Sequence, residues 1–128
     1  AAHGIPYVAT ASVGYPMDLD RKVRKALSIR GPKYVQIHVP CPLGWGTEPS
    51  RTIDYARLAV NTGLYPLYEV EDGVTTALKI PKRVSVEEYL KGQTRFRHLF
   101  EGEGRKQEIA EIQKVADQNI EKYGLIAE

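Results

Sequence analysis

The amino-acid sequence predicts an α/β fold with parallel strands, followed by a hairpin and a helical tail. Its first half alternates strand and helix patterns, an order that favours a parallel pair of strands. Its second half carries an Asp72-Gly73 hairpin signal and a long amphipathic helix pattern. The 128 residues suffice for one domain, and the composition (42% hydrophobic, 27% charged) is typical of a globular chain.

The first strand and helix are predicted from short patterns. A strand covers residues 7–11, and Leu19 begins an apolar row at helical spacing. That row consists of Leu19, Val23, Ala26 and Leu27. Gly31-Pro32 ends this helix, because glycine accepts the left-handed conformation and proline cannot continue a helix.

A second strand and helix follow. Residues 34–39 are β-branched at alternate positions, which predicts a strand. Ser50 is a candidate N-cap for a helix over about 51–62, and Gly63 is its stop.

The second half begins with two strands, 67–71 and 74–78, on either side of the hairpin signal. Ser85 opens a capping box for a short helix, and the apolar spacing predicts a final helix over about 105–123. Gly102-Glu103-Gly104 reads as a hinge before it. We expect residues 1–70 to form the C-terminal part of an α/β domain, and residues 71–128 a hairpin and helical extension packed on it or on a neighbour.

Pro40–Pro49 is the most informative stretch. Three prolines and two glycines predict an irregular loop there, at the carboxyl end of a strand, where open α/β sheets bind ligands. Cys41 in this loop can be a nucleophile, a metal ligand, a redox thiol or a small buried hydrophobe.

Two aromatic residues near this loop leave alternatives open. Trp45 is a recognition platform, a lid over the core or a subunit contact. His38 is expected to be a satisfied structural histidine in a sheet covered on both faces. A Cys41–His38 nucleophile pair is disfavoured, because side chains three apart on a strand point to opposite faces.

Net charge, apolar runs and cysteine count bear on the class of function and on the cellular location. A net charge of +2 gives no reason to expect nucleic-acid binding, and the basic residues at 21, 22, 24 and 25 are expected to form a solvated helix face. The sequence has no apolar run of about 18 residues for a membrane span. A single cysteine fits a reducing, cytoplasmic setting.

Several blocks, in order, resemble the C-terminal half of the β subunit of pyruvate:ferredoxin oxidoreductase (pyruvate synthase). They are Ala2–Ser12, Gly31–Trp45 with its Pro-Cys-Pro run, Thr52–Val60, Tyr65–Val70, Val86–Leu90 and Arg95–Leu99. The resemblance implies oxidative decarboxylation of pyruvate or a related 2-oxo acid with coenzyme A, and reduction of ferredoxin. It implies that residues 1–70 are the C-terminal part of a thiamine-diphosphate-binding domain. The cofactors implied are thiamine diphosphate, Mg²⁺ and a 4Fe-4S cluster, with Cys41 as the fourth cluster ligand.

This sequence departs from the family pattern in two ways. The Gly-Asp-Gly…Asn motif for Mg²⁺ and diphosphate is absent, and so are the three other cluster cysteines. In the family both lie upstream of the segment matched here. We therefore expect this chain to be inactive alone and to work with the rest of the β subunit and other oxidoreductase subunits. The alternative is a non-catalytic module that docks on partner subunits through the Trp45 loop and the last helix.

Overall fold

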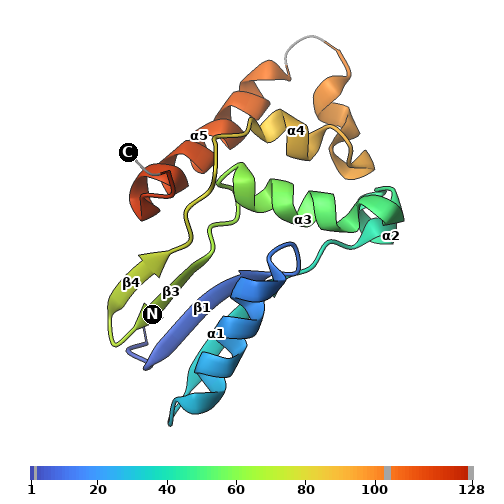
Figure 1. The fold of residues 1–128 in the computed structure, drawn as a ribbon. Coiled ribbons are helices and arrows are strands. Elements are labelled where there is room, and N and C mark those ends of the chain that lie inside the picture. The colour runs from blue at the N-terminus through green and yellow to red at the C-terminus, as the bar shows by residue number, and fades with distance from the viewer. Residues whose placement is uncertain (2, 103–104, 127–128) are drawn as a thin grey trace.

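The computed structural model describes residues 1, 3–102 and 105–126. Figure 1 shows the strands and α1 at one end and the other helices at the opposite end. The strands are β1 (Tyr7–Ser12), β2 (Lys33–His38), β3 (Tyr68–Glu71) and β4 (Val74–Ala77). The α-helices are α1 (Pro16–Ser28), α2 (Pro42–Trp45), α3 (Thr52–Asn61), α4 (Val86–Leu90) and α5 (Lys106–Tyr123). Two 3₁₀ segments are η1 (Pro49–Arg51) and η2 (Thr94–Phe100).

The strands form one mixed sheet in the order β2-β1-β3-β4. β1 pairs with β2 in parallel, from Tyr7 opposite Lys33 to Ser12 opposite His38. β3 runs antiparallel to β1 and turns into β4 through Asp72 and Gly73. Both turn residues have positive φ, 48° and 84°, as a two-residue hairpin turn requires. The predicted α/β class, parallel pair and hairpin are confirmed.

The hairpin extends the same sheet, since β3 pairs directly with β1. The predicted division at residue 70 falls inside β3. The two-part organisation, 1–70 and 71–128, therefore stays a prediction.

Helix α1 covers one face of the sheet with a different side from the one that the apolar spacing predicts. Ala26 is buried and packs on Tyr7 and Ala9 of β1, as expected, but Leu27 is 76% exposed. Lys22 is only 1% exposed, and its Nζ donates to the Thr10 carbonyl at 2.8 Å. The expectation of a solvated basic face is wrong for Lys22, because an internal carbonyl acceptor holds its ammonium under the helix.

The helical end has its own core. Tyr55 and Ala59 of α3 pack with α4, η2 and α5, including Leu99 and Ala116. A second apolar cluster, which contains Val60, Leu67, Ile80 and Leu125, lies between these helices and the sheet. The trailing segments thus pack on the α/β part, one of the two arrangements expected.

The structure corrects two local predictions, the irregular loop and the Ser50 cap, and does not describe part of a third, the hinge. The Pro40–Pro49 stretch is not wholly irregular, because it contains α2, whose first helical position is a proline that needs no N–H partner. Ser50 does not cap α3; it lies in η1, and Arg51 precedes α3 without a side-chain cap. Residues 103 and 104 of the predicted hinge lie outside the described residues.

Other boundary signals are confirmed. The Ser85 side chain accepts the Glu87 N–H at the start of α4. Gly63 follows α3 with φ +84°, and a Cβ there would lie 2.9 Å from the Ala116 carbonyl oxygen. Glycine is therefore needed for both backbone conformation and close packing on α5.

No helix in the described part of the chain is long and apolar enough to cross a membrane.

Candidate functional site

Cys41 lies where the sequence places it, directly beyond the carboxyl end of β2, and its side chain is exposed. It is the N-cap of α2, and its sulfur accepts the Gly44 N–H at 3.4 Å. A Cβ at Gly44 would come within 3.2 Å of that sulfur. The turn therefore brings a backbone amide close to the thiol while leaving the thiol open to the outside.

An apolar hollow of about 550 Å³ lies beside the thiol. It is lined by Cys41, Pro42, Leu43, Gly46, Thr47 and Pro49. Proline fixes the backbone on both sides of the turn, and Gly46 closes α2 in the left-handed conformation at φ +63°. The sulfur therefore sits on a short, stiff turn rather than on a long loop.

The C-terminal segment holds this turn in place. The Arg95 guanidinium stacks on Trp45, 3.8 Å from the ring centroid. The Thr94 hydroxyl donates to the Gly46 carbonyl at 2.8 Å. Arg95 Nε in turn donates at 2.8 Å to Gln93, which is buried. We call Gln93, Thr94 and Arg95 the clamp; sequence patterns alone did not point to it.

Trp45 is half-buried and also packs on His38, with ring centroids 5.8 Å apart. His38 contacts Tyr65 on another side, at 4.8 Å. Of the three alternatives for Trp45, this packing favours a lid.

His38 packs between aromatic rings, but the expectation that its ring nitrogens are hydrogen-bonded is wrong for Nδ1. Its Nδ1 is buried and has no hydrogen-bond partner in the described part of the chain. Burial, and then the charge of Arg95, hold the pKa of His38 below its ordinary value. No hydrogen bond found within residues 1, 3–102 and 105–126 joins His38 to Cys41, whose sulfur is bonded to Gly44 instead.

Metal chemistry at Cys41 needs ligands from elsewhere. No group of three or more His, Cys, Asp or Glu side chains able to hold a metal ion occurs among the described residues. A 4Fe-4S cluster takes four thiolates, and hydrogen bonds to those sulfurs tune its potential. The exposed thiol, its Gly44 N–H bond and the apolar hollow fit one ligand of such a cluster. The same absence within the described residues holds for Mg²⁺, since no cluster of carboxylates that could bind it occurs there.

A second charged network ties α1 to the sheet. Glu69 of β3 is buried and accepts hydrogen bonds from Tyr7, Arg21 and Lys25 at 2.9–3.1 Å. Burial raises the pKa of Glu69, but these donors outweigh it and lower the pKa to about 2. The partners are all internal, so this network holds the fold together.

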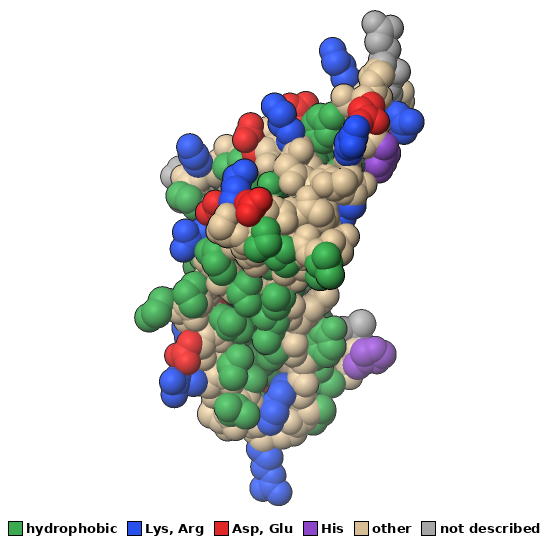
Figure 2. All heavy atoms as spheres, turned by 90° about the vertical axis from the view of Figure 1, so that its right-hand side faces the viewer, with side chains coloured by type: hydrophobic (Ala, Val, Ile, Leu, Met, Phe, Trp, Pro, Cys, Tyr) green, Lys and Arg blue, Asp and Glu red, His purple; other side chains and the backbone are tan. Residues whose placement is uncertain are grey.

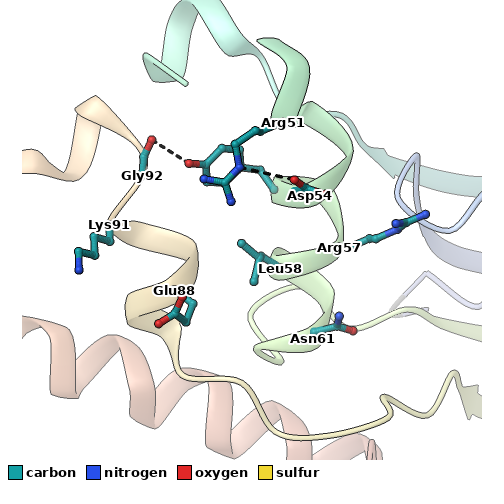
Figure 3. A pocket seen from close by; sticks show the side chains of 9 residues that line it. Arg51, Asp54, Arg57, Leu58, Asn61, Glu88, Lys91 and Gly92 are labelled. Carbon is teal, nitrogen blue, oxygen red and sulfur yellow. Dashed lines mark hydrogen bonds and ion pairs between the residues drawn. The ribbon is translucent and has the colours of Figure 1, made fainter. Parts of the chain in front are cut away.

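A pocket of about 460 Å³ lies between α3 and α4 (Figure 3). Arg51 pairs with Asp54 at 3.5 Å, and Tyr55 donates to the Gly92 carbonyl at 3.0 Å across the pocket. Arg57 points away, toward the Gly14 carbonyl. Arg51 and Arg57 are therefore engaged by acceptors of this chain.

No protein-family model matches the chain. It is, however, 52% identical over 126 residues to "Pyruvate synthase subunit PorB" of Methanosarcina barkeri, an alignment covering 98% of this chain and 43% of that subunit. PorB of Methanocaldococcus jannaschii is also 52% identical, with 98% and 41% covered. "Ketoisovalerate oxidoreductase subunit VorB" of Pyrococcus abyssi is 42% identical over 132 residues, with 99% and 40% covered.

The fold and these comparisons show that the chain is homologous to oxidoreductase subunits, namely PorB of pyruvate synthase and VorB of ketoisovalerate oxidoreductase. In particular, it matches the C-terminal part of pyruvate synthase subunit PorB, so the resemblance stated from the sequence is confirmed. The chain spans about two-fifths of the length of these relatives.

Proposed function

We propose that this chain forms the C-terminal part of the β subunit of a pyruvate synthase. The complete enzyme decarboxylates pyruvate, transfers the acyl group to coenzyme A and passes the electrons to ferredoxin. The observation that supports this most is the similarity of nearly the whole chain to PorB, at 52% identity.

Within that enzyme, Cys41 serves as one ligand of the 4Fe-4S cluster. Such a cluster, when bound, accepts and releases one electron at a time. The role of this chain is to present a thiolate at a fixed point, since Pro42 and Gly46 shape the turn and the clamp holds it from outside. The Gly44 N–H directed at the sulfur stabilises negative charge there, which favours the reduced cluster.

Thiamine diphosphate and Mg²⁺ belong to the complete subunit in this proposal. The upstream segment of the β subunit supplies their anchor and the other three cysteines, so the chain alone does not turn over. Pyruvate, coenzyme A and ferredoxin are then substrates and partner of the whole complex. A cytoplasmic location stays a prediction, supported by the single cysteine.

The experiment is Cys41→Ser in the full-length β subunit, assembled with its partner subunits. We expect iron content to fall by the equivalent of one cluster, or that cluster's spectrum to change, and pyruvate-dependent ferredoxin reduction to be lost. Ser50→Ala is the matched control, because Ser50 is exposed in the following 3₁₀ segment and does not line the hollow beside Cys41. Unchanged iron and electron transfer in Cys41→Ser would show that the ligand assignment is wrong.

The non-catalytic docking module is less well supported. Trp45, which was to provide the docking contact, is engaged by His38 and Arg95 of its own chain. The last helix buries Ile109 and Ala116 in the helical core. Assembly of the Cys41→Ser subunit with its partner subunits distinguishes the two functions. A docking module would restore a fully active complex without Cys41, whereas a cluster ligand would not.

A further inference from the structure

Strand β2 lacks the cover that a strand of an α/β sheet normally has. None of its six residues is buried, whereas all six residues of the neighbouring β1 are. Tyr34 is 55% exposed, Ile37 is 44% exposed, and Val39 just beyond the strand is 57% exposed. Parallel strands carry apolar residues because both faces are buried in the complete fold. The expectation of a sheet covered on both faces is therefore wrong for β2 within this chain.

The outer edge of β2 is also open. The Val13 N–H donates to the His38 carbonyl at 3.2 Å, so the peptide groups of His38 face the β1 side. Peptide groups alternate along a strand, which turns the N–H and C=O of Val35 and Ile37 to the other side. In the described part of the chain, β2 pairs only with β1. No proline interrupts β2, and Val35 and Ile37, whose peptide groups face the free edge, are apolar. Lys33 at the start of the strand is charged, so the usual protection of a free edge is missing only from the later part of β2.

Helix α1 also carries exposed apolar side chains. In the described part of the chain, Met17 is 84% and Leu27 76% exposed. Figure 2 shows hydrophobic side chains gathered over the middle and lower part of the face on this side of the molecule, with charged groups mainly around them. Large exposed apolar areas of this kind mark interaction surfaces.

We infer that the preceding part of the subunit packs around this edge, with one of its strands added to β2. It would cover Ile37 and Val39 on the face that α1 shares, and Tyr34 on the opposite face. The comparisons supply the occupant: the relatives match this chain only in their C-terminal part, and more than half of their length precedes the match. The inference rests on the proposed function only in assuming that such a preceding part exists. It is independent of Cys41 and of any cluster.

The first test is hydrogen exchange by mass spectrometry on the full-length subunit in its assembled complex. We expect peptides covering 33–39 to exchange at least about 100-fold more slowly than an open strand edge, because all their amides are then bonded. The opposite edge provides the comparison within the same sample, since β4 has exposed residues at 74–76. Fast exchange of the Val35 and Ile37 amides would overturn the proposal.

The second test uses a matched pair of variants in the same full-length subunit. Ile37→Lys places a charge in the proposed seam, and we expect the melting temperature to fall by about 5 °C or more. Val74→Lys places the same charge on β4, where Val74 is 67% exposed, and we expect a change within about 1 °C. If Ile37→Lys does not fold at all, Ile37→Thr gives a graded version of the same comparison. Equal effects at the two positions would contradict the seam.

A second copy of the chain is the competing occupant. Hydrogen exchange across a dilution series, with sedimentation reporting the assembly state, distinguishes the preceding part of the subunit from a second copy. Loss of protection at residues 33–39 when the complex dissociates into single subunits would overturn the proposal. Cys41→Ser should leave this protection unchanged, so failure of the ligand assignment and failure of the seam are distinguishable.

Discussion

Glu69 is the buried anion that ties three elements together, and we expect Glu69→Gln to destabilise this chain by about 3 kcal/mol at pH 7. The value follows from the pKa of Glu69, which the donors on Tyr7, Arg21 and Lys25 lower from an ordinary 4.5 to about 2. Each unit of difference between folded and unfolded chains corresponds to about 1.4 kcal/mol. Because the folded pKa is the lower one, this stabilisation is complete above about pH 4.5 and disappears as the pH falls through about 2.

The assay is urea unfolding followed by Trp45 fluorescence at several pH values from 7 down to 3. The difference between the original chain and Glu69→Gln should be largest at pH 7 and shrink steadily below pH 4.5. Glu71→Gln is the control, because Glu71 is on the same strand but half-exposed and pairs only with Lys25. It should cost less than about 1 kcal/mol. A pH-independent difference, or an equal cost at Glu71, would refute the reasoning.

Three further predictions concern the neighbourhood of Cys41. Arg95→Ala should cost about 1 kcal/mol and make Trp45 more accessible to a fluorescence quencher, because the stacked guanidinium is lost; unchanged quenching would count against the clamp. Gly46→Ala should cost about 2 kcal/mol or more in urea unfolding, because φ is +63° and the new Cβ would lie 2.5 Å from Thr94 Cβ. His38 has a lowered pKa in the folded chain, so the chain should lose stability as the pH falls below about 6.5. His38→Phe should reduce this loss of unfolding free energy between pH 7.5 and 5.5. The same dependence of unfolding free energy on pH in both chains would show that His38 is not its source.

Local signals predicted most elements of the fold. The Asp72-Gly73 turn and the Ser85 cap act through their own backbone, so a short window of sequence suffices to find them. Ser50 failed as a cap because Pro49 starts a 3₁₀ turn one residue earlier. The prediction of Leu27 as a core residue was wrong, because no other element covers it in the described part of the chain.

The candidate site was predictable only in part. Cys41 could be placed from its position after a strand and from the family resemblance. The clamp could not, because Arg95 and Trp45 are fifty residues apart and their contact depends on how the helical end packs. The buried position of Lys22 likewise depends on the Thr10 carbonyl of another element, which charge patterning does not reveal.

The most direct test of the central claim is the iron content of the assembled enzyme with Cys41→Ser in its β subunit, measured together with the electron paramagnetic resonance spectrum of the reduced protein. We predict the loss or altered spectrum of one 4Fe-4S cluster, while the Ser50→Ala control keeps its full complement. Full iron content and an unchanged spectrum in Cys41→Ser would contradict the assignment of Cys41 as a cluster ligand.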